Sequence, residues 1–489
     1  MISPQILVWF RNDLRVHDHE PLWQAAKAGG GVIPVYCFDP RQFSETRFGF
    51  PKTGPIRAQF LRESVEALRE ILRKLGSDLI IRHGTPETVL PKLAEEFKAT
   101  ALYYHAEVTA EELAVEQAVE SALAKQTDAI YPPLEINRFW GATLYHLNNL
   151  PFEISKIPEL FTSFRKKLEK SATVEPAYGM PAKLPPIKVS DRGELPENFE
   201  KVTVCDRVVL PFRGGETAGQ ARLKDYFWKT SALRRYKETR NGMLGANYSS
   251  KFSPWLALGC LSPRYIYEQV QAYEEQRVRN DSTYWLVFEL LWRDFFRFMA
   301  LKHGNVLFKP VGIQGVSIPW KEDWERFDCW QQGKTGYPLV DANMRELLAT
   351  GFMSNRGRQN VASFLTKNLG IDWRIGAEWF ESQLIDYDVC SNYGNWNYTA
   401  GVGNDARGFR YFNIPKQSRQ YDPAGDYLRH WLPELANVAG DKIHEPWKLS
   451  QTEQKQWGVR LGVDYPRPVV DFFKSVKANE NVYLAAVGS

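Results

Sequence analysis

The chain is 489 residues long, 44% hydrophobic and 25% charged, with a formal net charge of +4 at pH 7. This length predicts at least two domains, and the apolar fraction is that of a folded protein. The positive net charge is mild, so it permits nucleic-acid binding but does not indicate it. No run of about 18 apolar residues occurs, and the first residues lack the charged-then-apolar pattern of a signal peptide, so we expect no membrane span and no secretion.

The N-terminal part alternates between strand-like and helix-like patterns. Short β-rich runs at 5–10, 32–38, 79–83 and 101–105 are separated by helical patterns that include 56–75 and 87–97. This alternation predicts an α/β domain over residues 1–130, with a Rossmann-like parallel sheet covered by helices on both faces. No GxGxxG motif follows the first strand, so the dinucleotide-binding fingerprint is absent.

The remainder of the chain divides into a connector and a helical region. Prolines multiply between residues 131 and 213, which predicts an interdomain connector. Beyond residue 214 helical spacing dominates, as at 218–236, 284–303, 339–350 and 359–369, so we expect an all-helical domain over 214–489. Thirteen of the sixteen tryptophans lie between Trp228 and Trp457, and core packing is the ordinary explanation for most of them.

Sequence patterns that commonly indicate disulfides, metal sites or nucleotide-binding loops are incomplete in this chain. The five cysteines are scattered without a CxxC pair, which favours free thiols in a reducing compartment and a cytoplasmic location. His17 and His19 lack the spacing of metal ligands, so we expect no metal. The Gly333-Lys334-Thr335 segment ends like a P-loop, but Asp328 stands where that motif requires glycine.

Five segments carry a resemblance to a known family. They are VWFRNDLRVHDHEPL (8–22), SSKFSPWLALGCLSPR (249–264), ELLWRDFFR (289–297), GKTGYPLVDANMRELLATGFMSNRGR (333–358) and IDYDVCSNYGNWNY (385–398). In order and approximate spacing they resemble the photolyase/cryptochrome family, whose members bind FAD and use blue light. Gln359 and Tyr398 stand where bacterial repair enzymes usually have Met and Trp, and both resemble the DASH branch.

The resemblance implies a set of cofactor-binding residues. They are Tyr236, Ser249, Ser250, Lys251, Phe252, Ser253, Glu289, Arg293, Asn355, Arg358, Asp386, Asp388 and Asn392. It places Asp386 and Asp388 at the flavin ring and ribose, Arg358 as the neutralising cation, and Asn392 beside flavin N5. From the residues alone, the serine run is more often a helix cap, and Glu289 and Arg293 are spaced for an intrahelical ion pair.

The resemblance also implies a substrate pocket and an electron path. Trp396, Trp373 and Trp320 match a chain of three tryptophans that links the flavin to the surface. The expected catalytic residues are Glu289, Trp292, Asn355, Asn392, Gln359 and Tyr398. The more polar wall at Gln359 and Tyr398 should stack a pyrimidine dimer weakly, so we expect repair of single-stranded DNA rather than extrusion from a stable duplex.

We therefore expect a monomeric, DNA-binding flavoprotein that splits cyclobutane pyrimidine dimers in blue light. Two basic groups suit sequence-independent DNA binding, although a solvated surface is the plainer reading: Arg234, Arg235, Lys237 and Arg240, then Arg356, Arg358, Arg407, Arg410 and Arg419. The branch implies 5,10-methenyltetrahydrofolate as a second chromophore, with Glu107 as a candidate ligand.

Two other functions stay open at this stage. The main rival is a blue-light receptor or DNA-binding regulator with little or no repair activity. The polar wall at Gln359 and Tyr398 favours this rival, whereas the lack of a long polar tail in the sequence weakens it. A generic flavin oxidoreductase is the weaker alternative, because the sequence offers no nicotinamide site.

Overall fold

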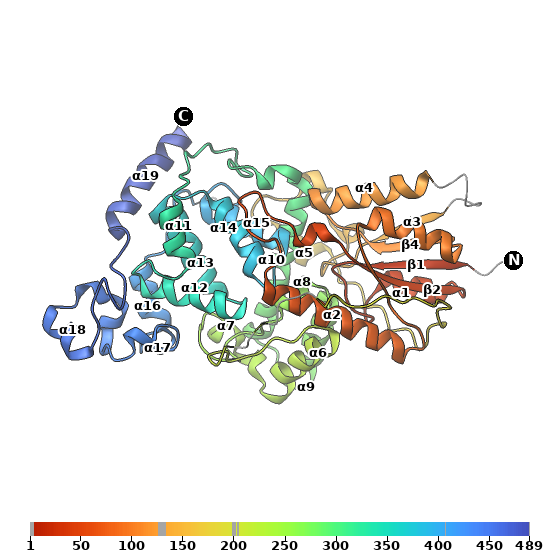
Figure 1. Cartoon of the computed structure of the whole chain (residues 1–489), viewed down its shortest axis with the longest axis horizontal. Coiled ribbons are helices and arrows are strands. Elements are labelled where there is room, and N and C mark those ends of the chain that lie inside the picture. The colour runs from red at the N-terminus through yellow and green to blue at the C-terminus, as the bar shows by residue number, and fades with distance from the viewer. Residues whose placement is uncertain (1–3, 126–133, 198–201, 203–204, 406, 489) are drawn as a thin grey trace.

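The computed structural model describes residues 4–125, 134–197, 202, 205–405 and 407–488. Figure 1 shows an α/β part at one end, coloured red to yellow, beside a larger helical part coloured green to blue. The N-terminus lies at the sheet end of the molecule, and the C-terminal helices lie at the opposite end. The predicted fold class, a parallel α/β domain followed by a helical domain, is confirmed.

The sheet is parallel throughout and has the strand order β3-β2-β1-β4-β5. Its strands are β1 (Gln5–Phe10), β2 (Gly31–Phe38), β3 (Ile80–His83), β4 (Ala101–His105) and β5 (Glu135–Phe139). The first four coincide with the predicted runs. The fifth was not predicted, because β5 is a polar, largely exposed edge strand with no apolar run. It lies within the segment predicted as the connector, so the sheet extends beyond residue 130.

Helices cover both faces of the sheet because the side chains of a strand alternate between faces. In β1, Leu7 and Trp9 pack with side chains of α3 (Pro86–Phe97) and α4 (Ala110–Ala124). Val8 and Phe10 pack on the other side, in the same core as α1 (Glu20–Lys27) and α2 (Pro55–Lys74). A central strand buried on both faces explains why its sequence reads as a continuous apolar run.

A helical part follows the sheet, and its first helix lies within the segment 131–213 that was predicted as the connector. Its α-helices are α5 (Phe161–Ser171), α6 (Glu216–Lys224), α7 (Tyr236–Thr239), α8 (Ser253–Ala257), α9 (Pro263–Gln276), α10 (Asp281–His303), α11 (Trp324–Gln331), α12 (Pro338–Thr350), α13 (Asn355–Ser363), α14 (Trp373–Gln383), α15 (Val389–Ala400), α16 (Ile414–Tyr421), α17 (Asp426–Trp431), α18 (Gln451–Trp457) and α19 (Phe472–Gly488). Single turns of 3-10 helix lie at Pro40–Phe43, Leu147–Asn149, Ile154–Lys156, Ala232–Arg235, Gly304–Phe308, Pro433–Leu435, Gly440–His444 and Pro446–Lys448, and π-helical turns at Asp225–Lys229 and Phe364–Leu369.

Two predicted helices are confirmed and two are interrupted. Helices α10 and α12 coincide with the patterns at 284–303 and 339–350. The pattern at 218–236 breaks after a π-helical turn, where Ser231 adopts a left-handed φ of 49° that a helix cannot continue. The pattern at 359–369 likewise passes from α13 into a π-helical turn.

Buried ionic contacts join the sheet domain to the helical domain. The loop after β1 carries Asp18, which is buried and forms an ion pair with Arg264 at 2.6 Å. Arg15 donates to the carbonyl of Gly259 at 2.8 Å, and Glu216 accepts from the backbone N–H of Val16 at 2.7 Å. Because buried charges require such partners, these contacts fix the orientation of the two domains.

No helix among the described residues is long and apolar enough to cross a bilayer. All five cysteines are free thiols, as the sequence predicted. Three of them, Cys37, Cys260 and Cys390, are buried, and burial raises the pKa of the Cys260 thiol to about 12. These thiols therefore stay protonated and unreactive near neutral pH.

Candidate functional site

Three helices bring the predicted residues together. Both α10 and α13 pack against α15, and Gly394 makes the first contact possible, because a Cβ there would lie 2.2 Å from the ring of Phe296. Each helix presents residues spaced three or four apart, and therefore on one face. They are Glu289, Trp292 and Arg293 on α10, Asn355, Arg358 and Gln359 on α13, and Asn392 and Trp396 on α15, which Asp388 caps.

Arg358 and Asp386 form a close ion pair in this region. The guanidinium Nη2 donates to both carboxylate oxygens, at 3.0 and 2.7 Å, while Nε donates to the carbonyl of Met353 at 3.0 Å. The side chain of Asp386 is 1% exposed and that of Arg358 is 25% exposed. A buried carboxylate is thus paired with a cation, as the resemblance implied for the pair nearest the flavin ring.

Arg293 and Asp388 form a second, looser pair. Asp388 caps α15 by accepting from the N–H of Ser391 at 2.7 Å, and Arg293 Nη2 lies 3.7 Å from its carboxylate. Burial alone would raise the pKa of Asp388, but Arg293 and Arg297 offset it and hold the pKa below its usual value. Arg293 therefore pairs with Asp388 and not with Glu289, so the intrahelical ion pair that the sequence spacing allowed does not form.

The serine-rich segment 249–253 folds as a loop that leads into α8. Lys251 adopts a left-handed φ of 55° and Phe252 follows in the right-handed region, an arrangement that turns successive backbone N–H groups toward a common side. Arg222 holds the loop in this shape, donating to the carbonyls of Ser250 and Ser249 at 3.0 and 3.1 Å. Such a nest of N–H groups suits an anionic group, as expected for phosphate binding.

A buried cation lies beneath this loop. Lys251 Nζ donates to the carbonyl of Gly245 at 3.0 Å and packs over Tyr248 and Phe352, and burial lowers its pKa to about 8. Burial likewise raises the pKa of Glu346 to about 7, and its carboxylate accepts from Tyr427.

Two buried polar atoms on the predicted site residues or their neighbours are unsatisfied. The hydroxyl of Tyr248 and Oε1 of Gln359 have no hydrogen-bond partner in the described structure. The unpartnered atoms, the buried Lys251 and the N–H nest fit a dinucleotide that brings phosphates and ring donors, since buried polar groups are ordinarily satisfied. Tyr236, predicted to contact the phosphates, begins α7 and is buried.

The amide of Asn392 is oriented by the neighbouring helix. Its Nδ2 donates to the carbonyl of Ala377 at 3.0 Å, so the amide nitrogen faces α14 and Oδ1 faces away from that contact. An oxygen held in this way can accept a hydrogen bond from a ring N–H. The side chain therefore fits the predicted place beside flavin N5.

The three predicted electron-transfer tryptophans run from the core to the surface. Trp396 and Trp373 are buried, whereas Trp320 is partly exposed. The indole N–H groups of Trp373 and Trp320 both donate to the carbonyl of Pro310, at 3.2 and 3.3 Å, so these two rings are neighbours. Trp396 packs against α14 at Gly376, one turn after Trp373, where a Cβ would lie 2.3 Å from its ring.

The predicted substrate wall is aromatic on one side and polar on the other. Trp292 and Tyr398 meet edge to face with their ring centroids 6.2 Å apart, and Phe161 of α5 stacks on Trp292 at 3.7 Å. The hydroxyl of Tyr398 accepts a hydrogen bond from Arg407. Glu289, one turn before Trp292, forms an ion pair with Arg240 at 2.7 Å.

Comparisons with known proteins agree with this geometry. Residues 6–186 match the family model described as DNA photolyase, and residues 285–485 match the FAD binding domain of DNA photolyase. A protein named Cryptochrome DASH from Gloeobacter violaceus is 63% identical over 490 residues, which cover 99% of this chain and 97% of that protein. The chain belongs to the DASH branch of the photolyase/cryptochrome family.

Solved structures of the photolyase/cryptochrome family share the whole fold. The crystal structure of the Synechocystis sp. PCC6803 cryptochrome has a TM-score of 0.95 and 61% identity, covering 99% of both chains. A bacterial class III photolyase from Agrobacterium tumefaciens has a TM-score of 0.88 and 31% identity, covering 100% of this chain and 99% of that one.

Five cations from the two basic groups of the sequence lie near one another on a surface that we call the basic face. Its cations alternate with aromatic rings: Arg356 packs over Tyr421 at 4.6 Å, and Arg410 packs over Phe412 at 5.1 Å. The basic face comprises Lys237, Arg240, Arg356, Arg407 and Arg410. Ion pairs reduce the free charge of this region: Arg419 pairs with Asp441 and Glu445, Lys237 with Asp281, Arg240 with Glu289, and Arg407 with Asp405. Counting cations in the sequence therefore overstates the charge available to a partner.

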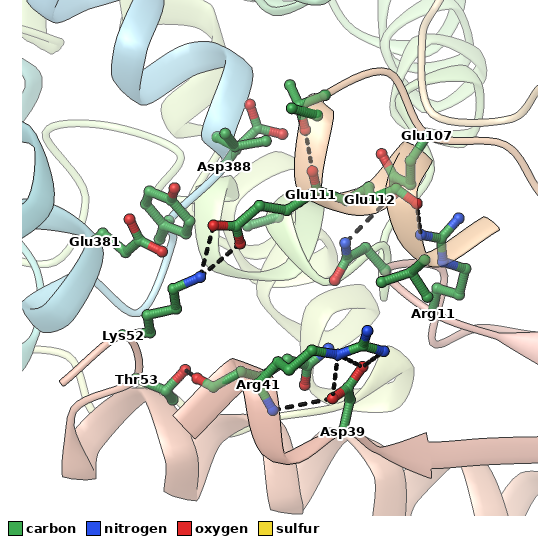
Figure 2. Close-up of a pocket in the computed structure, with 18 of the residues that line it drawn as sticks. Arg11, Asp39, Arg41, Lys52, Thr53, Glu107, Glu111, Glu112, Glu381 and Asp388 are labelled. Atoms are coloured by element: carbon green, nitrogen blue, oxygen red, sulfur yellow. Dashed lines mark hydrogen bonds and ion pairs between the residues drawn. The ribbon is translucent and has the colours of Figure 1, made fainter. Parts of the chain in front are cut away.

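A cavity of about 810 Å³ lies between the two domains of the cryptochrome. Figure 2 shows Arg11, Arg41 and Lys52 of the sheet domain facing Glu381 and Asp388 of the helical domain across it. The predicted flavin residues Arg293 and Asp388 belong to its lining, as does Tyr387. The segment 386–388 thus contributes to two sites, with Asp386 bound to Arg358 and Tyr387 in the cavity wall.

Glu107, the candidate antenna ligand, also lines this cavity. One of its carboxylate oxygens forms an ion pair with Arg297, and the other accepts from Asn12 at 3.3 Å. The cavity is large enough for a cofactor-sized ligand and carries both carboxylates and cations, which suits a pterin ring with an anionic tail.

Asp13, His19 and His105 form a buried cluster with ligand-type atoms within 4.8 Å of one another. His19 Nδ1 accepts from the N–H of Leu22 at 3.1 Å, so its Nε2 carries the proton and donates to Asp13 Oδ2 at 2.8 Å. His105 Nδ1 contacts the same oxygen at 2.7 Å, and burial lowers its pKa to about 4. A metal ion would need the nitrogen that already carries a proton, so we interpret this cluster as a hydrogen-bond network.

Proposed function

We propose that this protein is a blue-light-dependent flavoprotein that splits cyclobutane pyrimidine dimers in single-stranded DNA. The observation that carries the proposal is the aromatic wall of Trp292 and Tyr398 beside Glu289, reached from a basic face and backed by the flavin residues of α13 and α15. The relationship to photolyases supports the same reaction.

The chain's residues would hold FAD in defined ways. The loop around Lys251 would bind the phosphates, Asp386 and Asp388 would accept from the ring and ribose, and Asn392 would face N5. When bound in reduced form and excited by blue light, the flavin supplies the electron that the reaction needs.

The remaining roles belong to side chains of the wall. Trp292 and Tyr398 would bind the extruded dimer by its faces and exclude water from it. Glu289 would hydrogen-bond to a base carbonyl, and this bond strengthens as negative charge develops on the dimer. Asn355 and Gln359, one turn apart on α13, would bridge between the dimer and the cofactor.

The preference for single strands follows from the cost of extrusion. Turning a base out of a duplex costs a few kcal/mol, and less in single-stranded DNA. Tyr398 has a smaller ring than tryptophan, and its hydroxyl is occupied by Arg407. An extruded dimer therefore gains less stacking energy from this wall than from a wall of two indoles. This difference favours a substrate whose bases are already unpaired.

Blue-light repair of a thymine dimer tests the proposal, with pre-reduced protein and matched single-stranded and duplex oligonucleotides. We expect repair of the single strand, and a quantum yield lower by up to about tenfold in Glu289→Gln, because an amide N–H donates a weaker hydrogen bond than a carboxylic acid to a carbonyl on which negative charge develops. Flavin content should not change. An unaltered yield in Glu289→Gln would remove that role from Glu289.

The outcomes on the two substrates separate the alternatives. Repair of both would show that the Gln359 and Tyr398 wall does not limit extrusion. Repair of neither, with flavin and DNA still bound, would favour a blue-light receptor or DNA-binding regulator. We propose in addition that the protein acts as a monomer in the cytoplasm; the five free thiols support the reducing compartment.

DNA binding is expected to depend steeply on salt. Neutralising phosphates with five cations predicts a slope of log affinity against log salt of roughly −3.5 for single-stranded DNA, because each contact contributes about −0.7. Arg356→Gln should make that slope shallower by about 0.7, as measured by fluorescence anisotropy. Arg419→Gln is the matched control, because its charge is already paired with Asp441 and Glu445. Equal slopes for the two variants would contradict the assignment of the basic face.

We propose that the interdomain cavity holds the second chromophore, 5,10-methenyltetrahydrofolate. The support is its size, its position against Asp388 and Arg293, and the carboxylate of Glu107 in its wall. Carboxylates are suited to accept the paired N–H donors of a pterin ring, and the cations Arg41 and Lys52 in the cavity wall suit a glutamate tail. Glu107 would be the pterin-binding carboxylate.

Replacing Glu107 by glutamine should weaken folate binding by about tenfold or more, because a hydrogen bond to a charged group contributes about 1.5–3 kcal/mol. Absorbance and titration with the folate give the readout, while flavin content reports on integrity. Glu111→Gln is the control, since that carboxylate is largely exposed and pairs with Lys52. Unchanged folate affinity in Glu107→Gln would exclude Glu107 as the ligand.

A further inference from the structure

Glu289 is ion-paired before any substrate is present. Arg240, which directly follows α7, places Nη2 2.7 Å from Oε1 of Glu289, and the two side chains are 18% and 26% exposed. Tyr236, at the start of α7, is an ionisable neighbour of this carboxylate: burial and then the nearby Glu289 raise the pKa of its phenol. A carboxylate in this pair is ionised and can only accept hydrogen bonds, so it has no proton to donate to a base carbonyl.

Arg240 is also part of the basic face, where like charges gather. It lies 5.9 Å from the ring of Trp285, over which Lys237 also packs at 4.9 Å. Burial lowers the pKa of Arg356, and the nearby Arg240 and Arg410 lower it further, so these guanidinium groups repel one another. Phosphates stabilise neighbouring cations of this kind. Two anions, Glu289 and a phosphate of the DNA backbone, can therefore compete for Arg240.

We propose that Arg240 exchanges Glu289 for a DNA backbone phosphate when the dimer binds, and that Glu289 takes up a proton as the pair separates. This inference rests on the proposed function and concerns the protonation state in which the repair site works. Arg240 is a positioning residue in this scheme: it acts on the reaction through Glu289, which touches the dimer.

The proton balance is simple. The free protein holds Arg240 and an ionised Glu289; the complex holds Arg240 on a phosphate and a neutral Glu289, and one proton comes from water. Burial raises the pKa of the Glu289 carboxyl while Arg240 lowers it, so removing Arg240 leaves the raising effect in place, and a nearby phosphate adds to it. A neutral carboxylic acid can then donate its O–H to the base carbonyl that becomes negative during ring opening.

Infrared difference spectroscopy in the dark measures this proton directly. A single-stranded oligonucleotide with a thymine dimer should produce the band of a protonated carboxyl group in the wild type, and Glu289→Gln should remove it. In Arg240→Gln the band should be present before DNA is added, whereas Arg240→Lys should behave like the wild type. Lys237→Gln is the matched control, since it removes a cation of the same face that pairs with Asp281 rather than Glu289.

Binding affinity gives a second readout with a defined sign. Because a proton is taken up, affinity for the dimer should fall as pH rises, by up to about tenfold per unit between the pKa values of Glu289 in the free and the bound protein. That dependence should vanish in Glu289→Gln and in Arg240→Gln, and persist in Lys237→Gln. Circular dichroism and flavin content confirm that each variant is folded.

Three results would overturn the inference. If the wild type binds and repairs the dimer without a new carboxyl band, Glu289 stays ionised. If Arg240→Gln shows no band in the free protein, Arg240 does not control the proton. If the wild type neither binds nor repairs the dimer, the proposed function fails and the exchange fails with it, a pattern distinct from normal repair without proton uptake.

Discussion

Replacing Trp396 by phenylalanine is expected to reduce light-driven reduction of the bound flavin to background. Trp396 is the buried member of the chain, it packs against α14 one turn from Trp373, and Trp373 and Trp320 share the carbonyl of Pro310. Phenylalanine keeps most of the packing but is far harder to oxidise than indole. The measurement is the absorbance of oxidised flavin under blue light with an external reductant.

Trp330→Phe provides the matched control. Trp330 is fully buried and its ring lies 6.5 Å from that of Trp396, but it is not part of the predicted chain. It should retain photoreduction, and both variants should repair dimers normally once their flavin has been reduced chemically. Loss of photoreduction in Trp330→Phe, or its persistence in Trp396→Phe, would show that electrons leave by another route.

Replacing Arg358 by methionine is expected to destabilise the fold and to deplete the flavin. The change leaves the carboxylate of Asp386, 1% exposed, without its cation. Breaking a buried ion pair typically costs 3–5 kcal/mol, and we expect the lower end, about 3 kcal/mol, because the side chain of Arg358 is 25% exposed. Thermal unfolding and the ratio of flavin to protein absorbance provide the measurements.

A double variant distinguishes the charge from the loss of packing. Asp386→Asn combined with Arg358→Met removes both charges and should recover part of the stability lost in the single variant. Arg419→Gln breaks an exposed pair with Asp441 and should cost at most about 1 kcal/mol. A single Arg358→Met variant with normal stability and full flavin content would contradict the role assigned to this pair.

The sequence predicted correctly the elements that local residue spacing determines, and it predicted the contacts between residues that belong to motifs of the family. The continuous apolar run of β1 predicts a strand that is buried on both faces, and the structure has it at the centre of the sheet. Helices α10 and α12 follow directly from spacing. Arg358 and Asp386 lie in different motifs, and only the resemblance suggested that they meet.

Contacts across long sequence distances could not be predicted in the same way. Arg222 shapes the loop at Ser249 and Ser250, but a single arginine on an amphipathic helix gives no sign of its partner. The pair of Arg240 and Glu289 joins two segments almost fifty residues apart. Helix spacing favoured Arg293 as the partner of Glu289, and tertiary packing placed Arg293 at Asp388 instead.

The apolar core does not stop at the boundary between the two domains. One continuous cluster runs from Val8 of β1 and Phe60 of α2 to Phe295 of α10 and Trp396 of α15. The sheet and the helical domain are therefore expected to melt cooperatively, in one transition and not in two. Because a ligand that binds the native state stabilises the whole cooperative unit, flavin held among the helices should protect the distant strands from hydrogen exchange as well.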